Sequence, residues 1–317
     1  KKAISPKNGF NGASFTSNYK YFIHTFEDSN TPLVYSLRES KTGELVRRIM
    51  DNNELLKKLE PYNLSRKDFS QINLNGQDLN MWMIKPTNFN PKKKYPVLIY
   101  QYSGPGSQEV ENRWNNNRDF WHQLLAQKGY IIVCVDGRGT GFKGKKFKKV
   151  TYGQLAKYET EDQISFARYL SKLPYIDKNR IGIWGWSYGG LISTNSILKG
   201  NDIFSLAIAV APVTNWRFYD TIYTERFMGL PKNNSDGYDL NSPLNFAHLL
   251  EGDYLLIHGS ADDNVHLQNT MRMVEELIQQ DKQFEWMIYP DKNHGIYGGN
   301  TSIHLYNKMT NFIEKKL

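Results

Sequence analysis

A serine flanked by glycines is the first feature of the sequence that points to chemistry. Ser187 lies in the stretch 185–189, which reads Gly-Trp-Ser-Tyr-Gly and matches the Gly-x-Ser-x-Gly pattern. The apolar run 181–184 predicts a buried strand before it, and a helix is expected from Tyr188 onward. A turn this tight needs both glycines, because larger side chains would collide with the strand and the helix. The pattern predicts a nucleophilic serine at a helix N-terminus, whose free N–H groups favour an oxyanion. The alternative is a glycine-rich turn whose serine only caps the helix.

Such a serine needs a base, and the base needs a carboxylate to orient it. The apolar run 254–258 is followed by Gly-Ser-Ala-Asp-Asp, so the carboxylate falls on Asp262 or Asp263. Either residue would follow the C-terminal end of a strand, where ligands bind in open α/β sheets. The residues do not separate the two, and one of them could instead cap a helix that begins near Val265.

His294 is the candidate base among the seven histidines. It follows the predicted strand 284–289 and precedes the predicted helix 301–315. It therefore fits the order serine, carboxylate, histidine, in which each residue stands on a loop after a strand. The alternative is a surface-loop histidine. The other six lie before the required position, in β segments, or at or within helices: His24, His122, His248, His258, His266 and His304.

Two groups could stabilise an oxyanion next to the serine. Tyr102 ends the predicted strand 97–102, at the position from which this kind of fold recruits a second donor. Its phenol could supplement the backbone N–H of Tyr188. A core tyrosine at a strand end is the alternative.

An aromatic stripe follows the predicted strand 206–210. Trp216, Tyr219 and Tyr223 stand at positions i, i+3 and i+7, so the spacing predicts one face of a helix. Such a stripe is usually core packing. Here it lies on the side of the candidate serine, and a box of aromatic rings would suit a flat, rigid ring such as that of proline.

Residues 62–317 supply the elements that must position these groups. A hairpin is expected across Asn75-Gly76. Strands and helices then alternate, and the strands are nearly continuous apolar runs, which predicts a mainly parallel, doubly wound sheet of the α/β-hydrolase type. The expected strands are 69–74, 78–84, 97–102, 131–136, 180–184, 206–210, 254–258 and 284–289, and the expected helices are 121–128, 159–170, 188 onward, 267–279 and 301–315.

Residues 1–61 have a different character. Four short aromatic and β-branched stretches, separated by turn residues, predict a four-stranded antiparallel meander, and a short helix is expected at 53–58. One such sheet has little core of its own, so we interpret it as the last blade of a β-propeller, followed by a linker. The alternative is a small independent appendage. The four stretches are 14–16, 19–26, 32–38 and 44–50.

The composition is that of a folded protein, with 39% hydrophobic and 14% aromatic residues in 317. The net charge of +8 comes largely from short lysine runs such as 92–94, which we interpret as solvated surface and not as a nucleic-acid-binding face. No apolar run reaches the roughly 18 residues of a membrane span. The chain opens with Lys1 instead of Met, so we expect a piece of a longer or processed chain. The single cysteine, Cys134, is expected to be buried, and one cysteine allows no internal disulfide.

The chain from about residue 62 resembles the dipeptidyl-peptidase branch of the prolyl oligopeptidase family of serine peptidases. Six stretches carry the resemblance: 102–108 (Tyr-Ser-Gly-Pro-Gly-Ser-Gln), 136–141 (Asp-Gly-Arg-Gly-Thr-Gly), 184–190 (Trp-Gly-Trp-Ser-Tyr-Gly-Gly), 210–213 (Val-Ala-Pro-Val), 223–231 (Tyr-Thr-Glu-Arg-Phe-Met-Gly-Leu-Pro) and 258–266 (His-Gly-Ser-Ala-Asp-Asp-Asn-Val-His). The resemblance implies Ser187 as nucleophile, His294 as general base and acid, and Asp262 as the orienting carboxylate. It also implies an oxyanion hole made by Tyr102 and the backbone of Tyr188.

The same resemblance implies a substrate and a setting. The enzyme would remove dipeptides with penultimate proline or alanine from peptides with a free N-terminus, through an acyl-enzyme and without metal or cofactor. In this family, glutamates of a propeller that precedes the hydrolase domain hold the substrate ammonium group. A homodimer and a bacterial, periplasmic location are expected. Asn264 would bind the substrate backbone, and the pocket would be lined by Val213, Trp216, Tyr219, Tyr223 and Val265.

Several other functions compete with this one. A post-proline endopeptidase, a tripeptidyl aminopeptidase or an acylaminoacyl peptidase would use the same scaffold. A carboxylesterase or lipase would use the same triad, but the blade-like segment and the aromatic pocket argue against it. A catalytically dead relative that only binds peptides would typically have lost its nucleophile, whereas Ser187 is present.

Overall fold

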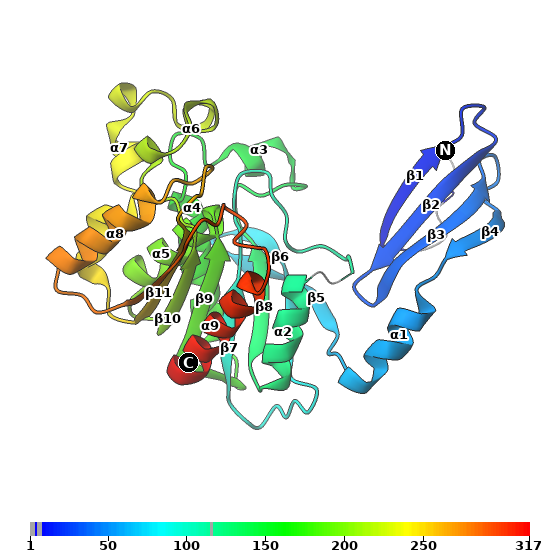
Figure 1. Cartoon of the computed structure of the whole chain (residues 1–317), viewed down its shortest axis with the longest axis horizontal. Coiled ribbons are helices and arrows are strands. Elements are labelled where there is room, and N and C mark those ends of the chain that lie inside the picture. The colour runs from blue at the N-terminus through cyan, green and yellow to red at the C-terminus, as the bar shows by residue number, and fades with distance from the viewer. Residues whose placement is uncertain (1–3, 5–7, 115–116) are drawn as a thin grey trace. The chain divides into compact units, whose positions relative to one another are not determined.

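The computed structural model describes residue 4, residues 8–114 and residues 117–317. The first residues of the predicted segment 1–61, including the opening lysines, lie outside this range. The chain forms two compact units, labelled by element in Figure 1. The smaller unit comprises Lys1–Asp68, Ile84–Asn88 and Glu111–Lys128, and the larger unit comprises Phe69–Met83, Phe89–Val110 and Gly129–Leu317.

The smaller unit contains a four-stranded antiparallel sheet in the order β1-β2-β3-β4. The predicted meander is therefore confirmed. The first strand begins earlier than the expected stretch 14–16, because residues 10–13 also pair with β2; at Gly12, the Thr25 hydroxyl occupies the space a Cβ would need. The strands are β1 (Phe10–Phe15), β2 (Tyr21–Asp28), β3 (Thr31–Glu39) and β4 (Leu45–Met50), followed by α1 (Asn53–Leu59) and the 3₁₀ turn η1 (Glu60–Tyr62); this unit also holds α2 (Asn117–Gln127).

Many of the large apolar side chains of this sheet are not buried. Phe22 and Phe26 of β2 are buried, but large apolar side chains on β1, β2 and β4 are exposed. A sheet of this size has too little core to bury both of its faces. The exposed side chains include Phe15, Ile23, Leu45 and Ile49.

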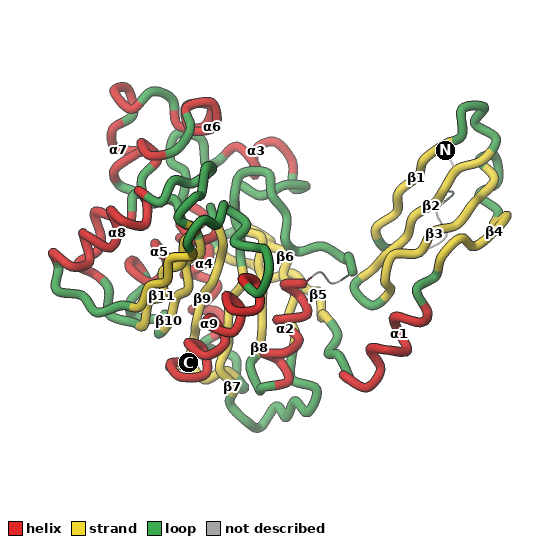
Figure 2. The backbone as a smooth tube through the Cα atoms, viewed as in Figure 1, coloured by secondary structure: helices red, strands yellow, loops and turns green. Residues whose placement is uncertain are grey.

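The larger unit is built on an eight-stranded sheet in the order β12-β11-β10-β9-β7-β8-β6-β5 (Figure 2). All the pairs from β8 through β7, β9, β10 and β11 to β12 are parallel. The hairpin at the start turns at Asn75 and Gly76, which both have positive φ (52° and 72°), as predicted. The strands are β5 (Lys67–Leu74), β6 (Gln77–Ile84), β7 (Tyr95–Tyr100), β8 (Ile131–Asp136), β9 (Ile176–Trp186), β10 (Leu206–Val210), β11 (Asp253–Gly259) and β12 (Glu285–Tyr289).

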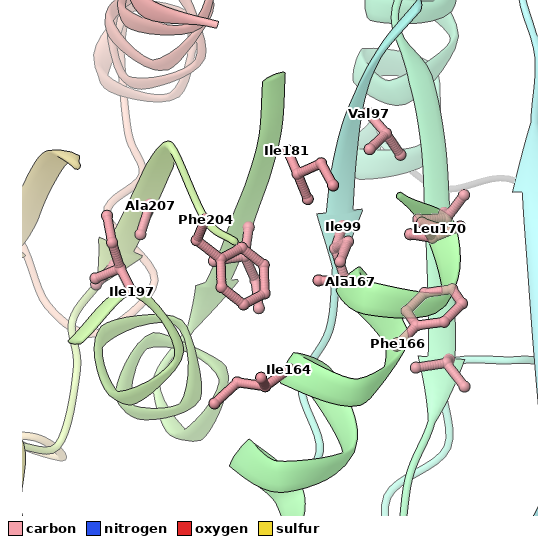
Figure 3. Packing of buried hydrophobic residues seen from close by; sticks show 14 of the residues in the cluster. Val97, Ile99, Ile164, Phe166, Ala167, Leu170, Ile181, Ile197, Phe204 and Ala207 are labelled. Carbon is pink, nitrogen blue, oxygen red and sulfur yellow. The ribbon is translucent and has the colours of Figure 1, made fainter. Parts of the chain in front are cut away.

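Helices cover both faces of this sheet. On one face, side chains of α4, α5 and α8 pack against the strands, and Figure 3 shows Phe166 and Leu170 of α4 beside Val97 and Ile99 of β7. On the other face, Leu317 at the end of α9 contacts the position of Gly182 in β9. The helices are α3 (Gly144–Lys149), α4 (Lys157–Leu170), α5 (Tyr188–Lys199), α6 (Thr221–Met228), α7 (Ser235–Asp239), α8 (Gln268–Gln279) and α9 (Thr301–Lys316), with 3₁₀ turns η2 (Trp216–Phe218), η3 (Pro231–Asn233) and η4 (Pro243–Leu249).

The predicted architecture of this unit is confirmed: a mostly parallel sheet with helices on both faces, entered through an antiparallel hairpin. Burial on both faces explains why β8 and β10 read as continuous apolar runs instead of alternating ones. Cys134 lies fully buried in β8, as expected. Within the described part of the chain, no helix has the length and the apolar character that a membrane span requires.

Candidate active site

Ser187 lies at the turn between β9 and α5, in a strained backbone conformation with φ 61° and ψ −118°. Its N–H donates to the carbonyl of Val210 at 2.8 Å, which fixes the turn to the neighbouring strand. A Cβ on Gly185 would lie 2.5 Å from the backbone of Gly189, and a Cβ on Gly189 would lie 2.5 Å from the carbonyl oxygen of Gln101. Both glycines are therefore required by close backbone approach, and the strain holds the serine at the tip of the turn.

Two donors face the position where an oxyanion would form. Tyr188 is the first residue of α5, so its N–H has no acceptor within the helix. The phenol of Tyr102 interacts with the Ser187 side chain, which by itself would lower the phenol pKa. Burial, together with the carboxylate of Glu109, raises the pKa of Tyr102, so the phenol stays protonated and able to donate.

The loop after β7 is locked onto the first turns of α5, which places Tyr102. The expected strand ends at Tyr100, and Gln101 leaves the sheet because its amide donates to the carbonyl of Gly189 at 2.7 Å and to the hydroxyl of Ser193 at 3.0 Å. The next glycine, Gly104, packs under the Tyr102 ring, where a Cβ would approach the ring to 2.6 Å.

The carboxylate that contacts the candidate base belongs to Asp262 and not to Asp263. Its Oδ2 lies 2.7 Å from Nδ1 of His294, and its Oδ1 accepts from the N–H groups of Asn264 and Val265 at 3.0 and 2.9 Å. Asp262 therefore holds the turn after β11. Neither aspartate caps a helix near Val265, because α8 starts only at Gln268 and has no side-chain cap. Burial alone would raise the pKa of Asp262, but hydrogen bonds from His258 and His294 hold it below its usual range.

His294 stands in the loop between β12 and α9, as predicted. Because Asp262 accepts at its Nδ1, the ring carries its proton there and leaves Nε2 as the basic nitrogen. The loop is tied to the ends of two other strands, β9 and β11. The indole of Trp186 donates to the carbonyl of His294 at 2.9 Å, and the N–H of Ala261 donates to the carbonyl of Lys292 at 3.0 Å.

The three aromatic residues gather as predicted, but they do not share one helix. Trp216 lies in the 3₁₀ turn η2, Tyr219 is extended with φ −117°, and Tyr223 lies in α6. Each short element has its own N-cap: Asn215, just before the stretch, accepts from Arg217 N–H, and Asp220, within the stretch, accepts from Tyr223 N–H. The prediction of a single helix was therefore wrong, and Asn215 and Asp220 carried the signal for two separate starts.

The aromatic rings form a cage next to the elbow. The ring of Trp216 lies 5.5 Å from that of Tyr188, 5.9 Å from that of Tyr219 and 6.0 Å from that of Tyr223, measured between centroids. Tyr188, Trp216, Val213 and Val265 belong to one buried cluster, with Tyr219 and Tyr223 packed against it. The Tyr219 hydroxyl donates to Oδ1 of Asn264 at 2.7 Å, which orients that amide.

A buried glutamate supports the cage from behind, and sequence reasoning missed it. Glu159 in α4 accepts from the Tyr188 hydroxyl at 2.6 Å, and that hydroxyl accepts from the N–H of Ala156 at 3.2 Å. Glu159 is fully buried, which raises its pKa to about 8 although its hydrogen bonds act in the opposite direction. No sequence signal separated it from the other acidic residues of α4. Elsewhere in the described residues, no cluster of histidine, cysteine and acidic side chains could hold a metal ion.

Comparison with known proteins places this site among peptidases. Residues 116–317 match the prolyl oligopeptidase family (Peptidase_S9). The chain is 38% identical over 305 residues to the "Probable dipeptidyl-aminopeptidase B" of Pyrenophora teres f. teres, covering 95% of this chain and 33% of that protein. It is 40% identical over 297 residues to the protein of the same name from Arthroderma benhamiae, covering 92% of this chain and 32% of that protein. The crystal structure of Porphyromonas gingivalis dipeptidyl peptidase 4 superposes with a TM-score of 0.96 at 48% identity, over 99% of this chain and 44% of that one. The chain thus spans about a third of the length of these curated relatives.

Proposed function

Because this chain belongs to the prolyl oligopeptidase family, we propose that it carries the chemistry of a serine exopeptidase that releases dipeptides from a free N-terminus. The penultimate residue of the substrate is proline or alanine. The observation that carries the proposal is the 2.7 Å hydrogen bond between Asp262 and His294, on a loop tied to the residue before Ser187. The names of the relatives, dipeptidyl-aminopeptidase and dipeptidyl peptidase, support a dipeptide as the product.

The reaction uses two displacements at one carbonyl carbon. The Ser187 oxygen attacks the carbonyl of the second substrate residue while Nε2 of His294 takes its proton, and Asp262 stabilises the imidazolium. The carbonyl electrons move to oxygen, which accepts hydrogen bonds from the Tyr102 phenol and the Tyr188 N–H. When this intermediate collapses, the C–N bond breaks and His294 gives its proton to the leaving amine. Water then attacks the acyl-enzyme by the same route, which frees the dipeptide and restores the serine.

The aromatic cage supports proline as the residue before the cleaved bond. A proline ring is compact, apolar and rigid, so it packs against aromatic surface with little loss of conformational freedom. The rings of Trp216 and Tyr223 stack on each other with an interplanar angle of 25°, and Tyr219 stands edge-on to both, so together they form one aromatic surface against which such a ring would pack.

The test compares two substrates of the full-length protein: a Gly-Pro anilide with a free amine and its N-acetylated form. We expect kcat/KM for the free amine to exceed that for the acetylated form by about 100-fold or more, because a site built for an ammonium group is left unpaired by the amide. Comparable or faster cleavage of the acetylated form would move the protein to the endopeptidase or acylaminoacyl branch. Faster cleavage of a Gly-Gly-Pro anilide would make it a tripeptidyl peptidase. Ser187→Ala is the control for a contaminating activity.

We also propose that the whole protein forms a homodimer and acts in the bacterial periplasm. The dimer rests on the family resemblance, and the location on that resemblance together with the single cysteine, Cys134. Light scattering after size-exclusion chromatography tests the first point, with a monomeric mass as the contrary result. Cell fractionation tests the second, and recovery with cytoplasmic markers would contradict it.

A further inference from the structure

A second histidine contacts the carboxylate of Asp262. His258 lies in β11 and is fully buried. Its Nδ1 lies 2.7 Å from the hydroxyl of Thr270 in α8, and its Nε2 lies 2.7 Å from the carbonyl oxygen of Val265. The same Nε2 lies 3.2 Å from Oδ2 of Asp262. Its place within a strand had excluded this histidine as the base, and the reaction described above does not use it.

The partners of the ring fix where its proton lies. A carbonyl oxygen can only accept, so Nε2 of His258 must carry a hydrogen directed at Val265. Oδ2 of Asp262 is the second acceptor within reach of that hydrogen. On the opposite side of the ring, the Thr270 hydroxyl occupies Nδ1 and prevents the ring from turning. The N–H of His258 is therefore shared between the wall of the aromatic pocket and the carboxylate.

Oδ2 is also the oxygen that accepts from Nδ1 of His294, so it lies between two imidazole rings. The other oxygen, Oδ1, is held by two backbone N–H groups, those of Asn264 and Val265. Every donor to Asp262 disperses its charge and fixes its rotamer. Two of these four donors, His258 and His294, are side chains. His258 lies in β11 and His294 in the loop after β12, so the carboxylate is held from two separate elements.

We propose that His258 is a positioning residue for the Asp262–His294 pair. Its shared N–H holds the carboxylate in the plane of the His294 ring and limits how strongly that carboxylate stabilises the protonated ring. It thereby sets the pH above which His294 acts as a base. The inference rests on the serine chemistry proposed above.

Among the hydrogen-bonding contacts of the His258 ring in the described residues, Asp262 is the charged group. Strand β12 places Ile288 opposite His258, and α8 contributes the neutral hydroxyl of Thr270. Asp263 and His266, on the same loop as Asp262, are exposed. His294 lies on the far side of Asp262, bonded to the same oxygen.

Three variants of the full-length protein separate the possible roles. His258→Leu removes both ring nitrogens, while His258→Gln keeps an N–H donor at the position of Nε2. Thr270→Val removes the partner at Nδ1 and leaves the ring in place. The matched control is His304→Leu, because His304 is an exposed histidine of α9 that bonds the Tyr289 hydroxyl and does not contact Asp262.

We expect His258→Leu to lower kcat by about 10- to 100-fold, the effect of losing one hydrogen bond to a charged group. The acid limb of the kcat/KM profile should move to higher pH by roughly half a unit or more, because a carboxylate with one donor fewer holds protonated His294 more strongly. His258→Gln should restore most of the rate and the limb. Thr270→Val should shift the limb in the same direction by less, and His304→Leu should leave it unchanged.

An acid limb that stays in place in His258→Leu, alongside a lower melting temperature, would show that His258 only fills the core and would overturn the proposal. If the kcat and the acid limb of His258→Gln match those of His258→Leu, the shared N–H is not the cause of the effect. If His258→Leu does not fold, Thr270→Val decides, since a wild-type acid limb there overturns the proposal too. If the wild-type protein itself shows no turnover that depends on Ser187, that result counts against the proposed function and not against the role of His258.

Discussion

The indole Nε1 of Trp186 donates a hydrogen bond of 2.9 Å to the carbonyl oxygen of His294. One residue is the last of β9 and immediately precedes Ser187, and the other lies in the loop after β12, 108 positions along the chain. The two strands do not pair, because β10 and β11 lie between them. The bond therefore joins the nucleophile turn directly to the loop of the base, across the carboxyl ends of the sheet.

Replacing Trp186 by Phe should lower kcat by about 5-fold with little change in KM, because one hydrogen bond of about 1 kcal/mol orients the base and does not touch the substrate. Steady-state kinetics with a Gly-Pro anilide measures the split. Trp286→Phe is the matched control, since Trp286 is 45% exposed on β12. An unchanged kcat in Trp186→Phe would show that the loop holds its position by other contacts.

Ser187→Ala and His294→Ala should each lower turnover by roughly 10⁴-fold or more, because the nucleophile, base and carboxylate act as a unit. The measurement is single-substrate turnover together with labelling by a fluorophosphonate, which should disappear in Ser187→Ala. Near-normal turnover in either variant would contradict the assigned mechanism.

Removing the Tyr102 hydroxyl in Tyr102→Phe should lower kcat by about 10²- to 10³-fold, the usual loss for one oxyanion donor. The ring stays in place over Gly104, so the pocket keeps its shape. The diagnostic quantity is kcat at saturating substrate. A change confined to KM would make Tyr102 a binding residue instead.

Tyr219→Phe should raise KM by about 3- to 10-fold while leaving kcat close to that of the wild type, because it removes the neutral hydrogen bond that orients Asn264. The Asn264 amide then turns freely, and the family resemblance implies that this amide binds the substrate backbone. Ile222→Val, at a side chain that is 78% exposed on α6, serves as the control. An equal loss in kcat would assign the Tyr219 hydroxyl to the chemical step.

Glu159→Gln should stabilise the fold, and the gain should grow with pH. Burial raises the pKa of Glu159 to about 8, so the folded protein keeps a proton there that the unfolded chain, with a pKa of about 4.5, has lost. The free energy of unfolding that this group contributes is therefore fully present below pH 4.5. It falls as the pH rises from 4.5 to about 8, and above about 8 the loss is complete. Glutamine is neutral throughout and still accepts from Tyr188.

Melting temperatures of wild type and Glu159→Gln between pH 5 and 9 test this sign. The two curves should converge at the acid end and separate toward the alkaline end. Glu161→Gln, at an exposed residue two positions away in the same helix, should give no such divergence. Parallel curves for Glu159→Gln would mean that the carboxylate is already ionised and satisfied at low pH.

Local patterns were enough to predict much of this molecule. The strand, turn and helix around Ser187 follow from glycine sterics within a few residues, and the structure has them where the pattern placed them. The Asn75-Gly76 turn specifies its hairpin in the same way, since both residues adopt positive φ cheaply. The apolar strands follow from the need to bury both faces of a sheet.

The aromatic segment shows where such patterns fail. The spacing of Trp216, Tyr219 and Tyr223 fits one helix, yet Asp220 accepts from the N–H of Tyr223 and starts a second helix between them. The three rings still meet, because they pack on one another, and Trp216 also packs against Tyr188.

The sequence by itself determined the nucleophile turn, the order of the candidate groups and the architecture that carries them, because each depends on neighbours along the chain. Local patterns left Asp262 and Asp263 open and the family resemblance implied Asp262, but only the tertiary structure shows which side chain the turn after β11 directs at a loop 32 residues away. The same holds for His258 and Glu159, whose types are common and whose roles arise from burial against Asp262 and Tyr188. Contacts between distant residues follow from strand order and register, and no local pattern encodes them.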